Sequence, residues 1–229
     1  MSAPEPVKTE RHGAVLEIVL DRPPVNAIDQ SLADALYAAF TGFRDDDALR
    51  VAVLIGGGHR AFSAGWDLKA AAIGGDDVGM TPGGWGGFTE LWDLHKPVIA
   101  AVDGPAVAGG FELVLACDLV VAAEHVEFWL TEVGLGILPS AGGLQWLPRR
   151  LGPSLAADLV LTGRRLSAQE AHAHGLVRDV VPLAELRAHA LALAAVIAEA
   201  PAETVQAAKA ILRRTAHLPI DVAFRSGGG

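Results

Sequence analysis

Apolar residues along the chain alternate between short continuous runs and longer stretches with helical spacing. The continuous runs lie at 13–21, 50–56, 97–103, 116–123 and 125–130. Such runs are typical of strands that are buried on both faces of a sheet. The first stretch with helical spacing covers residues 30–43, and Asp29 directly before it is expected to cap its first turn. The alternation predicts an α/β fold.

The last third of the chain is predicted to be almost entirely helical. The expected helices lie at 155–161, 167–175, 183–200 and 202–215. Ser167 is a suitable cap for the second of them, and one short strand is expected at 176–181.

Three segments of the first half are harder to place in a core. Residues 1–11 are polar and contain prolines, which predicts a loose arm. Residues 73–87 are too rich in glycine to order themselves, which predicts a mobile loop near a binding site. Residues 88–94 are expected to be helical.

The composition indicates a soluble globular protein with one substantial core. The 229 residues are 51% hydrophobic, and a net charge of −9 argues against a nucleic-acid or anionic-membrane partner. A local basic patch could still form from Arg149, Arg150, Arg164 and Arg165. The single cysteine, Cys117, excludes an intrachain disulfide and fits a reducing compartment. No apolar run approaches the ~20 residues of a membrane span, so a cytoplasmic protein is expected.

Candidate chemistry gathers in residues 104–118, GPAVAGGFELVLACD. Gly109 and Gly110 follow a predicted strand and open a predicted helix, where unshielded N–H groups and the helix dipole favour an anion. Glu112 stands beside that anion site, which suits a group that transfers protons. A glycine-cushioned turn followed by an ordinary surface glutamate is the alternative. Residues 64–66 form a second small-residue turn before a short helix, so two separate amides could converge on one oxygen.

The spacing of serine, histidine and aspartate residues gives little support for a serine-hydrolase site or a metal site. Ser63 and Ser140 sit among small residues, as a nucleophilic serine would, but no histidine or aspartate is placed by sequence to activate either. His172 and His174 are two residues apart and point in different directions on a helix, which argues against a metal site. A serine hydrolase therefore stays only as a rival interpretation.

Three motifs in the same order resemble the crotonase (enoyl-CoA hydratase/isomerase) superfamily. They are AFSAGWDLK at 61–69, the central segment 104–118, and TEVGLGILPSAGG at 131–143. The resemblance extends from about His12 to the last helix. Within the superfamily, AGWDLKAAA, PGGWGGFTELWDL, GGFELVLA and LTGRR look most like the carnitinyl-CoA dehydratases.

The resemblance implies a spiral of ββα units with a helical C-terminal part. The expected division is a core at 12–152 that carries the active site, and a helical part at 153–225 that builds trimers or dimers of trimers. The superfamily's chains usually continue past the AFRSG segment into one more helix, which this chain is expected to lack.

The resemblance also implies a site. The two amides of an oxyanion hole fall on the backbone of Trp66 and Gly109, and the two catalytic acids of the hydratases fall on Glu112 and Glu132. Water addition to a double bond conjugated with a thioester needs one group that takes a proton and one that supplies a proton. By analogy Glu112 is the base and Glu132 the donor. A Δ3,Δ2-enoyl-CoA isomerase and a non-catalytic acyl-CoA-binding or RNA-binding paralogue are the alternatives.

Coenzyme A is expected to bind as part of the substrate, with no separate cofactor and no metal. By resemblance it lies near Val25, Ala27, Ala64, Asp67 and Leu68. Lys69 is either a phosphate partner or an ordinary solvated lysine.

The five tryptophans invite a further hypothesis. An acyl group of the carnitine type carries a trimethylammonium, which aromatic faces attract. Trp85 is the first candidate for such a contact, and packing bulk is the alternative.

Overall fold

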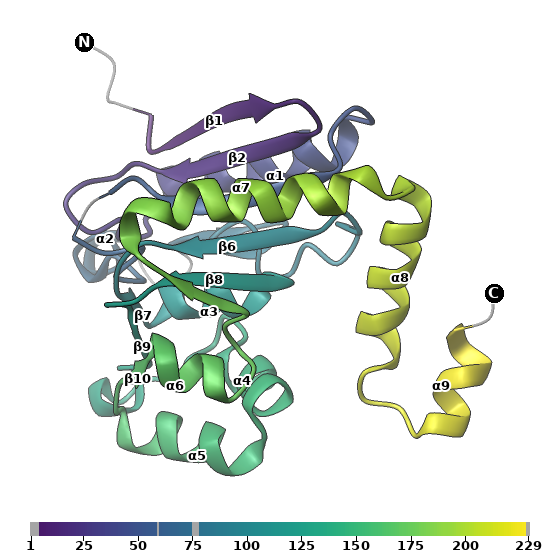
Figure 1. Ribbon diagram of the computed structural model, residues 1–229. Helices are drawn as coiled ribbons and strands as arrows, with labels where there is room; N and C mark the ends of the chain where they lie inside the picture. Colours follow the sequence, from purple (N-terminus) through teal and green to yellow (C-terminus); the bar gives the residue numbers. More distant parts are fainter. Residues whose placement is uncertain (1–4, 59, 75–77, 228–229) are drawn as a thin grey trace.

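A six-stranded sheet lies at the centre of the protein (Figure 1). The computed structural model describes residues 5–58, 60–74 and 78–227. The strands, in spatial order, are β1 (Val7–His12), β2 (Val15–Leu20), β3 (Val51–Gly56), β6 (Val98–Val102), β8 (Leu119–Ala123) and β11 (Asp179–Val181). Strand β1 is antiparallel to β2, and all other neighbours are parallel. Every residue of β3 and β6 is buried, which explains their continuous apolar sequences.

Two smaller β elements lie beside this sheet. One is a three-stranded sheet in the order β10 (Leu166–Ser167), β9 (Glu127–Trp129) and β7 (Ala106–Val107). The other is a hairpin of β4 (Met80–Thr81) and β5 (Gly84–Trp85). Only Ala108 separates β7 from the helix that begins at Gly109, and the Ala108 N–H donates to the Trp129 carbonyl of β9 at 2.9 Å, so this sheet anchors the start of the helix.

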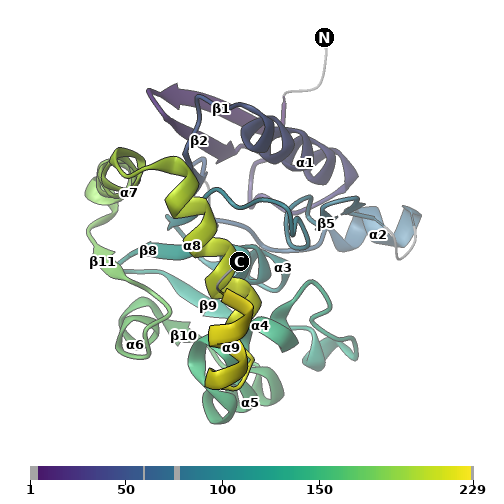
Figure 2. The ribbon, with the colours of Figure 1, turned by 90° about the vertical axis from the view of Figure 1, so that its right-hand side faces the viewer.

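Helices cover the sheet and form the C-terminal part. They are α1 (Gln30–Asp45), α2 (Leu68–Gly74), α3 (Gly109–Ala116), the 3₁₀ helix η1 (Val133–Leu135), α4 (Gly143–Leu151), α5 (Pro153–Thr162), α6 (Ala168–Ala173), α7 (Leu183–Glu199), α8 (Ala202–Thr215) and α9 (Ile220–Gly227). Helix α7 crosses one face of the sheet and contacts β2, β3, β6 and β8. Helix α3 is buried along its whole length. Figure 2 looks onto the side of the molecule where α8 and α9 lie.

Both predicted helix caps are present. The Asp29 carboxylate accepts a hydrogen bond from the Leu32 N–H at 2.9 Å, at the start of α1. The Ser167 hydroxyl accepts one from the Glu170 N–H at 3.1 Å, at the start of α6. Local side-chain chemistry therefore located these two helices correctly.

The prediction of a loose N-terminal arm is wrong for residues 7–11, which belong to β1. These residues pair with β2 along its free edge, in a register that joins Val7 to Leu20 and His12 to Val15. The pattern missed the strand because four of its six residues are exposed on an edge. Residues 1–4 lie outside the described part of the chain.

The prediction of an unordered glycine-rich loop is wrong for residues 78–87, which hold the β4–β5 hairpin, and residues 83–89 are buried. Residues 75–77 are outside the described part. The turn is ordered because it packs between helices α1 and α3. A Cβ added at Gly87 would lie 2.4 Å from the Ala33 carbonyl of α1, and one added at Gly86 would lie 3.1 Å from Leu113 of α3. Residues 88–94 form turns instead of the expected helix.

The helix expected at 155–161 is present as α5, and the described chain ends with α9, which the sequence pattern did not indicate. None of the helices that the described residues form is long and apolar enough to cross a membrane. The division of the chain at residue 152 stays a prediction.

Candidate active site

The start of helix α3 presents free backbone amides. Gly109 is the first helical residue, and Ala108 before it has a positive φ of 52°. The Gly109 N–H donates to no acceptor among the described residues, because the first turn of a helix has no partner of its own. The side of Gly109 is covered by Trp85: an added Cβ would lie 2.1 Å from that ring. The helix dipole adds positive potential at this point.

A second turn brings another amide to the same place. Gly65 has a φ of +79° and packs so closely that an added Cβ would lie 2.8 Å from the Gly109 nitrogen. The turn is held by the Val107 N–H, which donates to the Ser63 carbonyl at 2.9 Å. The N–H of Trp66, the next residue, also finds no acceptor among the described residues. The two turns are thus in close contact, and Trp66 and Gly109, each with an unused N–H donor, line the same cavity, an arrangement that is compatible with an oxyanion hole.

Two buried glutamates accompany these amides. Glu112 is 3% exposed and Glu132 is 6% exposed. Glu112 accepts a hydrogen bond from the Gly143 N–H at 2.7 Å, whereas Glu132 Oε2 is buried without a partner among the described residues. Burial is the main cause that raises the pKa of Glu112 to about 7, and the negative charge of Glu132 adds to it. Burial also raises the pKa of Glu132.

All four of these predicted residues, Trp66, Gly109, Glu112 and Glu132, line one cavity of about 600 Å³. The structure therefore brings together the residues that the sequence analysis assigned to catalysis. Two carboxyl groups whose pKa values are raised toward neutrality, beside free amide donors, can transfer protons at a carbon next to a developing oxyanion.

Some of the residues predicted to bind coenzyme A line this cavity, and others do not. Ala64 and Leu68 line it, and Val25, Ala27, Asp67 and Lys69 do not. Val25 is nevertheless adjacent, because its carbonyl accepts from the Ala64 N–H at 2.9 Å.

Asp67 has structural partners at the start of α2. Its carboxylate accepts from the N–H groups of Lys69 and Ala70 at 3.1 Å and pairs with Arg22 at 2.9 Å. Burial alone would raise the pKa of Asp67, but these partners outweigh it and lower the pKa. Arg22 also donates to the Ala27 carbonyl at 2.9 Å, so it ties the proline loop to the oxyanion turn.

Ser63 and His172, named in the rival interpretations, have structural partners. Ser63 is fully buried and its hydroxyl donates to the Asn26 carbonyl at 2.8 Å, so it supports the oxyanion turn. His172 binds the Val177 carbonyl at 3.0 Å through Nδ1. The described residues include one group with metal-ligand spacing, Glu10, His12 and Glu17 on β1 and β2. The Arg187 guanidinium already bonds both of its carboxylates, at 2.6–2.8 Å.

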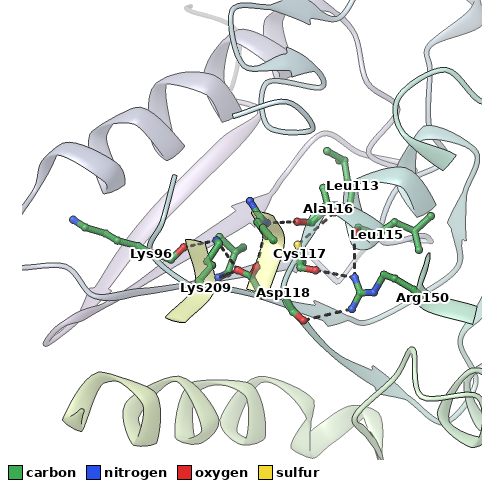
Figure 3. A network of polar contacts seen from close by, with 10 residues as sticks. Lys96, Leu113, Leu115, Ala116, Cys117, Asp118, Arg150 and Lys209 are labelled. Carbon is green, nitrogen blue, oxygen red and sulfur yellow. Dashed lines mark hydrogen bonds and ion pairs between the residues drawn. The ribbon is translucent and has the colours of Figure 1, made fainter. Parts of the chain in front are cut away.

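The opposite end of α3 is held by cations (Figure 3). Arg150 of α4 donates to two carbonyls at this end, at 2.8 and 2.9 Å. Lys209 and Arg213 of α8 pair with Asp118 at 2.7 and 3.1 Å. Cations are favourable at a helix C-terminus. Cys117 is buried here, and burial raises the pKa of its thiol to about 12, which indicates a packed thiol and not a nucleophile.

Two residues of the site were missed by sequence reasoning. Gly143 holds Glu112 through its N–H, and no sequence signal marks a backbone donor so far along the chain. Glu90 lines the same cavity but was assigned to a helix that does not form. Its only signal was an acid, one of two with Asp93, in the mostly apolar segment 88–94.

The paired amides and paired acids on this α/β spiral agree with the family to which the sequence belongs. The model of the Enoyl-CoA hydratase/isomerase family matches residues 10–225, so the chain belongs to this family. The predicted crotonase-type fold is thereby confirmed.

Individual members of this family can be compared with the chain in sequence and in structure. The chain is 48% identical to the carnitinyl-CoA dehydratase of Salmonella typhi over 222 residues, which cover 96% of this chain and 85% of that protein. The crystal structure of an enoyl-CoA hydratase from Mycobacterium tuberculosis H37Rv superposes with a TM-score of 0.91 at 38% identity, covering 97% of this chain and 87% of that one. A carnitinyl-CoA dehydratase structure from Mycobacterium avium 104 gives 0.88 at 36% identity, covering 98% and 91%.

Proposed function

We propose that this protein is a hydro-lyase that adds water to, or removes water from, a short-chain acyl-CoA thioester. The observation that carries the proposal is that two unused backbone amides and two buried glutamates line one cavity. Coenzyme A enters as part of the substrate, and the chemistry calls for no separate cofactor. The 48% identity with carnitinyl-CoA dehydratase supports the interconversion of carnitinyl-CoA and crotonobetainyl-CoA as the particular reaction.

In the hydration direction, Glu112 takes a proton from water while the water oxygen bonds to Cβ. The π electrons move toward the thioester carbonyl, and the N–H groups of Trp66 and Gly109 bind the resulting enolate oxygen. Glu132 then delivers a proton to Cα. Dehydration runs through the same steps in reverse. A pKa of about 7 lets Glu112 take and return a proton near neutral pH.

The nucleotide part of coenzyme A is proposed to lie over the first oxyanion turn and the proline loop. The residues concerned are Val25, Ala27, Ala64, Asp67, Leu68 and Lys69. Ala64 and Leu68 on the cavity wall and the exposed position of Lys69 support this placement.

Replacing each glutamate by glutamine tests the reaction. Glu112→Gln and Glu132→Gln are each expected to lower kcat for hydration by about 10²–10⁴. Glu199→Gln, an exposed substitution at the end of α7, is the matched control. Turnover is followed by thioester absorbance with a panel of enoyl-CoA and 3-hydroxyacyl-CoA substrates that includes crotonobetainyl-CoA.

Two outcomes would replace the proposal. If Glu112→Gln still moves a double bond in a 3-enoyl-CoA, the protein is an isomerase that needs only Glu132. If the wild type binds coenzyme A thioesters but turns over none, it is a non-catalytic paralogue.

A trimer, or a dimer of trimers, and a cytoplasmic location are also part of the proposal. Ile220 and Phe224 on α9 and Leu212 on α8 are each more than 70% exposed, which supports burial of this apolar face in an assembly. Sedimentation equilibrium and cell fractionation test the two points.

A further inference from the structure

The walls of the active-site cavity carry more negative charge than the reaction needs. Its described lining includes three acidic residues, Glu90, Glu112 and Glu132, and no lysine, arginine or histidine. Glu112 and Glu132 have roles in proton transfer. Glu90 has none, and it is an exposed residue, so its charge is available to a cationic group of the substrate.

Glu90 is fixed at its backbone and free at its carboxylate. Its N–H donates to the Gly83 carbonyl at 2.8 Å, and its stem packs on Gly84, where an added Cβ would lie 2.6 Å from the Glu90 Cβ. The carboxylate makes no hydrogen bond or ion pair with any described residue. Asp93, three residues further on, is different because it pairs with Arg44 at 2.7 Å.

Glu90 also stands at the junction with a second cavity of about 410 Å³. The two cavities share Glu90, Ser140 and Ala141, and Trp92 and Trp146 add aromatic walls to the second one. Trp85 supplies an aromatic wall on the active-site side.

Arg149 is the only basic residue among the described residues that line the two cavities, and it makes no ion pair with Glu90. Arg149 lines the second cavity only, and its Nη1 donates to the Gln145 carbonyl at 2.5 Å. The junction therefore keeps a negative charge beside aromatic faces, which is the environment that suits a quaternary ammonium.

We infer that Glu90 is a specificity-determining residue that binds a quaternary ammonium on the acyl group, with Trp85 and Trp92 as the aromatic contacts. The inference rests on the proposed function. A trimethylammonium has no N–H to donate, so only opposite charge and aromatic faces can recognise it. In a carnitine-type acyl group the nitrogen lies one methylene beyond Cβ, so it must meet the cavity wall beyond the catalytic glutamates.

A pair of substrates of equal shape tests the inference. Crotonobetainyl-CoA carries the trimethylammonium, and 5,5-dimethylhex-2-enoyl-CoA carries a neutral tert-butyl group in its place. The wild type is expected to favour the cationic substrate. Glu90→Gln is expected to reduce the ratio of the two kcat/KM values by about tenfold, mainly through KM. Glu90→Asp keeps the charge and is expected to retain most of the preference.

Asp93→Asn is the matched control, because it removes one charge from the same turn without touching either cavity. A ratio that Glu90→Gln leaves unchanged, or that Asp93→Asn lowers equally, would overturn the role of Glu90. Failure of the proposed function looks different: the wild type would then turn over neither substrate.

Discussion

Replacing Glu112 by glutamine is expected to stabilise the folded protein at alkaline pH while removing its activity. The variant keeps the shape and the oxygen that accepts from the Gly143 N–H at 2.7 Å, but it cannot ionise. Burial and the charge of Glu132 raise the pKa of Glu112 from 4.5 to about 7. Because a tenfold change in a proton equilibrium is worth about 1.4 kcal/mol, the ionised carboxylate lowers the free energy of unfolding by about 3 kcal/mol.

The sign follows from the two pKa values. Below pH 4.5 the carboxyl group is protonated in the folded and the unfolded chain, and ionisation costs nothing. Between pH 4.5 and about 7 only the unfolded chain releases its proton, so stability falls as the pH rises. Above about pH 7 the full cost is present.

Urea unfolding at about pH 5 and about pH 8, followed by tryptophan fluorescence, measures the effect. The stability gain of Glu112→Gln over wild type should be about 2–3 kcal/mol larger at the higher pH. Glu199→Gln should show no such difference, since that side chain is exposed. Equal gains of Glu112→Gln at both pH values would refute the raised pKa and the role of Glu112 as an acid–base group near neutrality.

Three further substitutions probe the geometry around the site. Gly109→Ala places a methyl group 2.1 Å from the Trp85 ring, so kcat should fall by about a hundredfold or more. Gly134→Ala is the control, because its added methyl group meets no atom within 4 Å. Similar kcat values for the two variants would contradict the tight contact at Gly109. Lys209→Met removes a buried ammonium from the network at the end of α3 and should lower the free energy of unfolding by about 3 kcal/mol, measured with urea. A loss near zero, as for an exposed lysine, would contradict the buried ion pair. Lys69→Ala should raise KM for the coenzyme A thioester by about threefold. The pantetheine thioester lacks the nucleotide phosphates, so the same increase in KM with that substrate would exclude phosphate binding by Lys69.

The core elements were predictable because their signals are local. The apolar runs of β3 and β6 and the Asp29 cap of α1 depend only on neighbouring residues. Strand β1 was missed because only Val7 of its six residues is buried, so its pairing with β2, not its own pattern, makes it a strand.

The glycine-rich turn shows the opposite kind of failure. Its composition indicates freedom, but Gly86 and Gly87 let the backbone approach α3 and α1 so closely that the hairpin is ordered. Glycine marks both mobile segments and tight packing, and only the neighbours distinguish them.

The candidate catalytic residues could be named from sequence because three separated motifs resemble the crotonase superfamily; the helix start at Gly109 with its nearby acid was by itself compatible with an ordinary surface glutamate. The motifs at 61–69, 104–118 and 131–143 were enough to name Trp66, Gly109, Glu112 and Glu132. Their chemistry could not be read from spacing alone: the raised pKa values come from burial, which several distant segments create together.

The sequence by itself therefore determined the α/β class and, through motifs that resemble the crotonase superfamily, the family and the candidate acid pair. Only the tertiary structure decided that Trp66 and Gly109 line one cavity, that Gly143 holds Glu112, and that Glu90 lines the same cavity. The physical reason is the distance along the chain over which each interaction acts. Caps, turns and apolar runs act within a few residues, whereas the shape and charge of a cavity depend on packing between segments that lie far apart in the chain.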